Sequence, residues 1–232
     1  MSHAVIETRA GLLGILIAVV ISVGGLVEIV PLYFSSQVTT PAPGVKPYTA
    51  LQLEGRDIYI REGCYNCHSQ MVRPFLDETV RYGINGQPAE YSRPGEFVYD
   101  HPFQWGSKRT GPDLAREGGR RDELWLLRHF DNPRSTSPGS VMPSYPHLLT
   151  GDIPWDVIQP RVDAMAMLGV PYGEALHHAS SMAHDQALKL AKDLESEGGP
   201  KGMETKDVIA LIAYMQRLGH DIQLSNQTGG KL

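Results

Sequence analysis

Cys64-Tyr65-Asn66-Cys67-His68 has the pattern CxxCH and contains both cysteines of the chain. Two thiols separated by two residues and followed at once by an imidazole predict covalent attachment of a haem c. Each thiol can add to one haem vinyl group, and His68 would then bind the iron as the proximal ligand. The motif therefore predicts one haem c, held by Cys64 and Cys67 and ligated by His68.

Two other uses of paired cysteines explain the sequence less well. A redox-active CxxC of the thioredoxin kind is expected near a βαβ pattern, and the sequence shows none. A structural zinc ion usually has four ligands in two clusters, and the other histidines form no second pair at that spacing. His177 and His178 are adjacent, and adjacent helical positions do not share a face. A chance CxxCH is the third alternative, and the absence of any cysteine outside the motif argues against it.

The composition is that of a folded protein without affinity for nucleic acid. The chain has 232 residues, which suffices for one substantial domain and an anchor, with 41% hydrophobic and 20% charged residues and a net charge of −5. Residues 151–205 contain four basic and nine acidic side chains, so this segment alone carries the acidic excess. We interpret that excess as a solvated face, and a docking surface for a basic partner is the alternative.

An apolar segment near the N-terminus predicts a membrane anchor. Residues 10–34 would form a helix of about 37 Å, which exceeds the roughly 30 Å hydrocarbon core of a bilayer and allows some tilt. Tyr33 and Phe34 suit the membrane–water interface. A cleaved signal peptide is the alternative, but its apolar core would be shorter and Ser35-Ser36 is a poor cleavage site. We therefore predict an uncleaved anchor over residues 1–35.

The prolines and glycine of residues 36–47 predict an extended linker, after which the haem domain covers residues 48–220. Insertions are expected at about 69–109 and 151–200, and residues 221–232 are predicted to form a polar, frayed tail. Because haem c is attached outside the cytoplasmic membrane, we expect a bacterial inner-membrane protein with its N-terminus in the cytoplasm and its haem domain in the periplasm. We expect the anchor to contact membrane lipid.

The soluble part is expected to be mainly helical. Thr49 is a candidate N-cap for a helix over 49–61, in which Gly55 would let another helix approach closely. Asp122 is expected to cap a helix to Phe130. The remaining expected elements are a loop region over 69–109 with a short hairpin around 95–101, helices over 153–168 and 172–195, and a last helix over 205–218 capped by Thr205 and closed by Gly219.

Two methionines are candidates for the second iron ligand. Met142 lies in the Pro- and Gly-rich stretch Val141-Met142-Pro143, where few packing demands compete for its thioether. Met203, in the loop before the last helix, is the main rival. Arg73 follows the haem motif and is a candidate partner for a haem propionate, as are Lys108 and Arg109.

The order of elements resembles a class I cytochrome c: a helix, CxxCH, Thr110-Gly111-Pro112-Asp113-Leu114, a short helix, the Met142-Pro143 loop and a final helix. The resemblance implies that the first and last helices cross beside the haem, with Gly55 and Tyr59 on one and Tyr214 on the other. It implies that the Pro112 carbonyl accepts a hydrogen bond from the proximal imidazole. It also favours Met142 as the distal ligand.

The literal stretches Ser69-Gln70-Met71-Val72-Arg73-Pro74, Trp105-Gly106-Ser107-Lys108-Arg109 and Val141-Met142-Pro143-Ser144-Tyr145 are similar to the monohaem subunit of cbb3-type cytochrome c oxidases. This resemblance implies a non-catalytic electron-transfer subunit of an oxygen-reducing, proton-translocating complex. Its implied partners are a dihaem cytochrome subunit as donor and the haem–copper catalytic subunit as acceptor. The alternatives are the small cytochrome subunit of another membrane reductase, such as nitric oxide reductase, and a haem sensor or enzyme with an open distal position.

Overall fold

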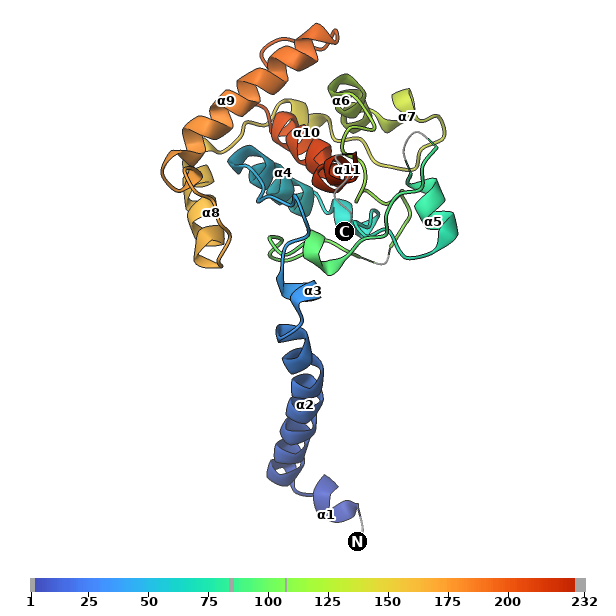
Figure 1. The fold of residues 1–232 in the computed structure, drawn as a ribbon, viewed down its shortest axis with the longest axis vertical. Helices are drawn as coiled ribbons and strands as arrows, with labels where there is room; N and C mark the ends of the chain where they lie inside the picture. Colours follow the sequence, from blue (N-terminus) through green and yellow to red (C-terminus); the bar gives the residue numbers. More distant parts are fainter. Residues whose placement is uncertain (1–2, 84–85, 107, 228–232) are drawn as a thin grey trace.

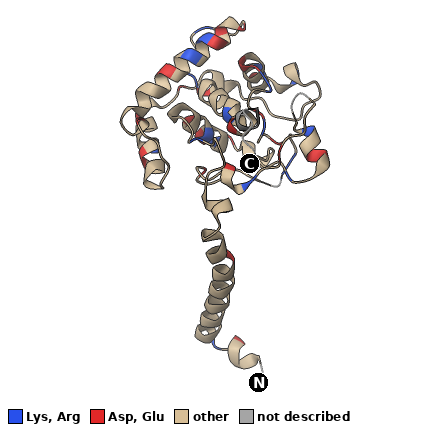
Figure 2. Cartoon of the chain, viewed as in Figure 1, with Lys and Arg blue, Asp and Glu red and all other residues tan. Residues whose placement is uncertain are grey.

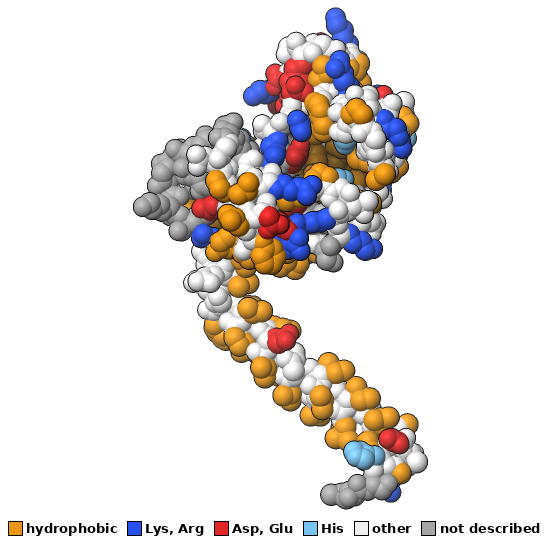
Figure 3. Space-filling view, turned by 90° about the vertical axis from the view of Figure 1, so that its right-hand side faces the viewer, with side chains coloured by type: hydrophobic (Ala, Val, Ile, Leu, Met, Phe, Trp, Pro, Cys, Tyr) orange, Lys and Arg blue, Asp and Glu red, His pale blue; other side chains and the backbone are white. Residues whose placement is uncertain are grey.

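The computed structural model describes residues 3–83, 86–106 and 108–227, and it is mainly helical, with no strand among these residues. A short helix, α1 (Ala4–Glu7), precedes the long helix α2 (Ala10–Tyr33), which extends away from the globular part (Figure 1). The 24 residues of α2 give a length of about 36 Å. None of them is buried, and apolar side chains cover the helix (Figure 3). Among the described residues, α2 is the one helix long and apolar enough to cross a membrane, which fits the predicted anchor.

The segment after α2 is less extended than predicted. Residues 36–39 form one helical turn, α3 (Ser36–Thr39), before the chain straightens. The Ala42 amide then donates to the Gly95 carbonyl at 2.8 Å. A Cβ atom on Gly95 would lie 2.9 Å from the Thr40 carbonyl oxygen, so the absence of a side chain there lets the two segments meet. The linker is therefore hydrogen-bonded to the globular part.

The globular part is built on the crossing of α4 (Ala50–Arg61) and α10 (Asp207–Arg217), as the resemblance implied (Figure 1). Thr49 caps α4 in a reciprocal capping box with Gln52, which confirms that prediction. At the crossing, a Cβ atom on Gly55 would lie only 1.9 Å from the carbonyl oxygen of Ala210. Only glycine permits so close an approach of the two backbones, so Gly55 sets the distance between these helices.

The loop region over 69–109 is irregular, as predicted, but its described residues contain no hairpin. It holds the helix α5 (Leu76–Arg81) and the 3₁₀ turn η2 (Pro94–Glu96). The Phe97 amide donates to the Pro94 carbonyl at 3.0 Å, and the Asp100 amide donates to the Phe97 carbonyl at 2.9 Å. These successive local turns use the backbone groups that a hairpin would pair across two strands. The hairpin prediction around 95–101 is therefore wrong.

Three short elements follow: α6 (Glu123–Asp131), α7 (Pro133–Thr136) and the 3₁₀ turn η3 (Pro146–Leu149). Asp122 caps α6 by accepting from the Trp125 amide at 2.7 Å, which confirms the predicted start. The buried residues Leu126, Leu127 and Phe130 lie at helical spacing and face the common core.

The second insertion forms α8 (Trp155–Met167) and α9 (Ala175–Ser196), which start within three residues of the predicted positions. Buried alanines recur every four residues along α9 and leave little distance between it and its neighbours: Ala175, Ala179, Ala183, Ala187 and Ala191. Arg161 on α8 pairs with Asp57 on α4 at 2.9 Å and with the buried Glu54. Figure 2 shows charges of both signs along the far half of α9. The insertion thus shares the main core and presents a solvated outer face.

The C-terminal region differs from the prediction at two places. Thr205 does not cap α10: its hydroxyl donates to Asp152 at 3.2 Å, and Lys206 precedes the helix without a side-chain cap. The chain turns at Gly219, which has φ +74°, and continues as α11 (His220–Gln227) where a frayed tail was expected. Ile222 is buried, and its burial explains why this polar segment is ordered. The rest of the predicted tail, residues 228–232, lies outside the described residues.

Candidate haem site

The haem motif follows α4 directly. Gly63, with φ +70°, ends the helix, and the 3₁₀ turn η1 (Cys64–Asn66) winds the motif so that the His68 amide donates to the Cys64 carbonyl at 3.0 Å. Cys64 is half-buried and Cys67 is exposed, and neither is in a disulfide. Burial raises the pKa of the Cys64 thiol to about 12, and the nearby Glu62 carboxylate adds to the rise. Two sulfurs outside any disulfide therefore lie within one turn of chain.

His68 is held in one orientation by the loop that carries Pro112. Its Nδ1 lies 2.8 Å from the Pro112 carbonyl oxygen, the contact that the resemblance implied. Burial lowers the pKa of His68, while the Pro112 carbonyl opposes that shift. A neutral imidazole that donates its Nδ1 proton to a carbonyl presents the lone pair of Nε2, which is the form that binds iron.

Gly111 leaves the space that the imidazole occupies. A Cβ atom at this position would lie 2.2 Å from His68 Cε1 and 2.7 Å from both ring nitrogens. The Gly111 amide donates to the Cys67 carbonyl at 3.0 Å, so the loop is also hydrogen-bonded to the residue that precedes His68. The Gly-Pro pair therefore works as a unit: the first residue makes room and the second accepts the hydrogen bond.

Asp113 ties the loop to the segment after the motif. Its buried Oδ2 accepts from the Ser69 hydroxyl at 2.6 Å and from the Met71 amide at 2.8 Å. Its Oδ1 accepts from the Ala115 amide at 2.9 Å. The backbone amide of Asp113 donates to the Tyr82 hydroxyl at 3.0 Å. Because Ser69 and Asp113 are the neighbours of His68 and Pro112, these bonds hold the imidazole and its acceptor together.

The two tyrosines at the helix crossing support the same segment. Both are fully buried, with ring centroids 5.5 Å apart. The Tyr59 hydroxyl donates to the His68 carbonyl at 3.2 Å, and the Tyr214 hydroxyl donates to Gln70 Oε1 at 3.0 Å. Burial raises the pKa of both phenols, so they remain neutral donors. The crossing of α4 and α10 thus positions residues 68–70.

The arginines considered as propionate partners are paired within the protein. Arg73 bonds to Glu78, and its guanidinium lies 5.6 Å from the centre of the Phe75 ring. Arg109 donates to the Ser69 hydroxyl at 2.8 Å and to the Met71 carbonyl at 2.6 Å, and it also pairs with Glu78. Burial would raise the pKa of Glu78, but hydrogen bonds from Arg73 and Arg109 outweigh it and hold the pKa at about 2. Lys108 is exposed.

The two candidate methionines have different surroundings. Met142 is half-buried beside the main core, in a loop that begins after Gly139, which has φ +80°. The Tyr145 amide donates to the Phe130 carbonyl at 2.8 Å and fixes the end of this loop to α6. Met203 is 7% exposed and belongs to the buried core itself. Met203 is therefore committed to packing, whereas Met142 keeps a partly open position.

A family model described as cytochrome c oxidase, mono-heme subunit/FixO matches residues 3–222. The chain belongs to the FixO family. Comparison with curated proteins gives no match. Membership makes the chain a monohaem subunit of a cytochrome c oxidase that associates with a catalytic oxidase subunit. It agrees with the oxidase resemblance and not with the alternative of a nitric oxide reductase subunit.

The residues of this FixO chain fit a covalently held haem. Two unpaired thiols lie one turn apart, and beside them His68 has its Nδ1 fixed by a carbonyl and a glycine against its ring. Among the described residues, no three His, Cys, Asp or Glu side chains gather as they would around a zinc ion. The donor set therefore fits a haem better than a zinc ion.

Sequence reasoning missed three residues of the site. Asp113 was quoted only as part of the Gly-Pro-Asp-Leu stretch, yet its carboxylate joins the two segments around His68. The steric role of Gly111 could have been inferred from its place before the acceptor proline. Burial lowers the pKa of His129 on α6, and the nearby His68 adds to this shift; the His129 ring stacks on Trp125 with ring centroids 4.5 Å apart and bonds to the Thr136 hydroxyl at 2.6 Å. No sequence pattern pointed to it.

Proposed function

We propose that the chain binds one haem c through thioether bonds to Cys64 and Cys67, with His68 and Met142 as axial ligands, and that it relays single electrons. In this proposal, electrons arrive from a dihaem cytochrome subunit or another cytochrome c and leave to the haem–copper catalytic subunit. The observation that carries the proposal is the 2.8 Å contact of His68 Nδ1 with the Pro112 carbonyl, directly beside two unpaired thiols.

The haem supplies a reversible one-electron couple when bound. The protein residues then have separate tasks. The two cysteine sulfurs fix the group to the chain, and the Pro112 carbonyl retains the Nδ1 proton so that the imidazole stays a neutral ligand. A methionine thioether on the other side would raise the reduction potential and leave no open position for a substrate. Arg73, Tyr59 and Tyr214 act from the surrounding pocket, the tyrosines through residues 68–70.

The proposed location is the bacterial inner membrane, with α2 as a single-pass anchor in lipid and the haem domain in the periplasm. The N-terminus would lie in the cytoplasm. Support comes from the length of the apolar helix α2 and from the absence of buried residues in it. The proposed units are the anchor, residues 1–35, the linker, residues 36–47, the haem domain, residues 48–220, and the tail, residues 221–232.

A double variant, Cys64→Ser/Cys67→Ser, tests the relay in the assembled oxidase. Without thioether bonds the subunit should lose its haem, so oxidation of reduced cytochrome c by the complex should stop. The catalytic subunit should still bind carbon monoxide after chemical reduction, which serves as the control for its integrity. If the assembled double variant oxidised cytochrome c at the wild-type rate, electrons would not pass through this subunit.

A further inference from the structure

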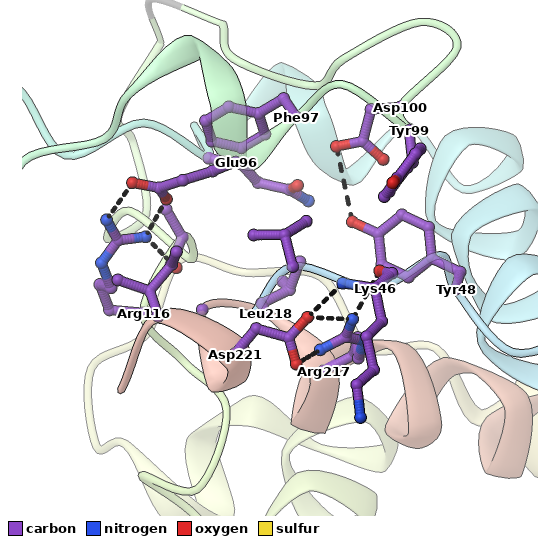
Figure 4. Close-up of a pocket in the computed structure, with 15 residues that line it drawn as sticks. Lys46, Tyr48, Glu96, Phe97, Tyr99, Asp100, Arg116, Arg217, Leu218 and Asp221 are labelled. Carbon is purple, nitrogen blue, oxygen red and sulfur yellow. Dashed lines mark hydrogen bonds and ion pairs between the residues drawn. The ribbon is translucent and has the colours of Figure 1, made fainter. Parts of the chain in front are cut away.

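A cavity of about 50 Å³, shown in Figure 4, is lined in part by Gln70, the second residue after His68. Its walls come from five parts of the chain: the end of the linker with Lys46 and the following Tyr48, Gln70, the segment 96–100, Arg116, and the junction of α10 and α11 with Arg217. A water molecule needs roughly 10–15 Å³ of such space, so the cavity has room for about three to five water molecules.

Three polar side chains that line the cavity are buried and have a polar atom without a partner. They are Gln70, Asp100 and Arg116, which are 1%, 6% and 4% exposed, and the atoms are Nε2, Oδ1 and Nε. A buried polar atom without a hydrogen bond costs about 1–3 kcal/mol. Two donors and one acceptor around a cavity of this size are the partners that ordered water molecules require.

Two arginines of the cavity are paired with carboxylates. Arg116 uses its terminal nitrogens on Glu96 at 2.8 and 3.0 Å, and Arg217 pairs with Asp221 (Figure 4). Asp221 also accepts from the Lys46 amide at 2.8 Å. The ion pair of Asp100 is longer: its Oδ1 lies 3.6 Å from Arg56 Nε, while a terminal nitrogen of Arg56 donates to the Pro102 carbonyl.

The cavity is connected to the haem site through Gln70 and a row of tyrosines. Gln70 accepts from Tyr214, and Tyr48, which lies 3.5 Å from Asp100 Oδ2, has its ring 5.5 Å from that of Tyr214. Tyr59 comes next, also at 5.5 Å, and donates to the His68 carbonyl. A charge on Asp100 is thus separated from the His68 segment by buried aromatic rings, which screen it much less than water does.

We propose that this cavity is a water site and that its water carries a proton between solvent and Asp100, which takes up the proton when the chain receives an electron and releases it when the electron leaves. This inference rests on the proposed electron relay. The proton comes from bulk water and the electron from the donor cytochrome, so the added negative charge is partly neutralised inside the protein.

The surroundings of Asp100 raise the pKa of its carboxyl group towards neutral pH. Burial raises the pKa of Asp100 to about 6, against the opposing effects of Arg56, the Tyr48 hydroxyl and Arg217. The neighbouring phenols of Tyr48, Tyr172 and Tyr214 have raised pKa values because of burial, so they stay neutral. Its raised pKa therefore lets Asp100 change charge close to neutral pH.

The test is the reduction potential of the full-length holoprotein in detergent, measured by spectroelectrochemistry between about pH 5 and pH 8. Because an ionised Asp100 stabilises the oxidised state, the wild-type potential should fall as pH rises through the titration and then level off. Asp100→Asn should remove this slope and keep the potential at its low-pH value. The matched control, Asp221→Asn, removes a carboxylate of the same cavity that is already paired and should keep the slope.

A second variant keeps the test decisive if Asp100→Asn does not fold. Tyr48→Phe removes a hydroxyl that favours ionised Asp100, so the inflection should move to higher pH. The reduced-minus-oxidised infrared spectrum should contain a protonated-carboxyl band that Asp100→Asn lacks. A holoprotein with a flat potential, or a slope that survives Asp100→Asn, overturns this inference alone. A chain that acquires no haem overturns the proposed function as well.

Discussion

Gly111→Ala places a methyl group where the structure has the imidazole of His68. The added Cβ atom would lie 2.2 Å from His68 Cε1, whereas ordinary contacts begin at 3.4 Å, so ring and loop must separate by at least 1.2 Å, the difference of these distances. Such a movement is incompatible with the 2.8 Å bond from Nδ1 to the Pro112 carbonyl. Gly111 has no positive φ, so the backbone itself tolerates alanine and the effect reports on the contact with His68.

The expected loss in the free energy of unfolding of Gly111→Ala has two parts. Forcing an extra methyl into a packed site costs about 1–3 kcal/mol, and loss of one hydrogen bond adds about 1 kcal/mol. A total of roughly 2–4 kcal/mol should lower the melting temperature of the full-length holoprotein by about 5–15 °C. Thermal unfolding followed by circular dichroism measures this shift, and solvent exchange of the His68 Nδ1 proton should become faster.

Gly14→Ala is the matched control, because a methyl there meets no atom within 4 Å. It should leave both readouts unchanged. If Gly111→Ala melted like the wild type and its Nδ1 proton stayed protected, the described packing of His68 against the Gly-Pro loop would be incorrect.

Three further predictions concern the supports of the site. Gly55→Ala should destabilise the protein by at least about 2 kcal/mol, since its methyl would lie 1.9 Å from the Ala210 carbonyl oxygen and force α4 and α10 apart; urea unfolding measures it. Asp113→Asn should lower the free energy of unfolding by about 2–3 kcal/mol, because the side-chain amide cannot accept all the hydrogen bonds that the buried carboxylate accepts. A urea midpoint equal to that of the wild type would contradict the role of Asp113 in joining the two segments. The pKa of Glu78 is about 2, below its ordinary value, so its stabilising effect is complete above about pH 4.5 and is lost as pH falls towards 2. The difference in unfolding free energy between wild type and Glu78→Gln should therefore shrink over that range, and a constant difference would show that Glu78 is not the group responsible.

Local sequence signals predicted the parts of the fold that depend on neighbouring residues. Thr49 and Asp122 cap their helices because a side-chain oxygen reaches an amide three residues later, a relation visible in the sequence. The role of Gly55 was also predictable, since a glycine inside an amphipathic helix usually has a packing reason. The haem motif is equally local.

Signals that depend on distant residues were misjudged. Thr205 is a residue type that often caps helices, but its hydroxyl donates instead to Asp152, which lies more than fifty residues earlier in the chain. Arg73 and Arg109 were considered as propionate partners because nothing in the sequence shows that Glu78 folds back between them. The order of α11 depends on the burial of Ile222, which periodicity in a short polar segment does not reveal.

The central claim, a haem c carrier with His68 and Met142 on the iron, is tested most directly by optical spectra of the haem-loaded full-length chain and its Met142→Ala variant. The account predicts that the oxidised wild type shows the weak red-region band of methionine–iron ligation. It also predicts that Met142→Ala loses this band and that its reduced form binds carbon monoxide, which the wild type does not. An unchanged variant spectrum would contradict the assignment of Met142. Ready binding of carbon monoxide by the wild type would contradict the carrier itself and favour an open-site haem sensor or enzyme.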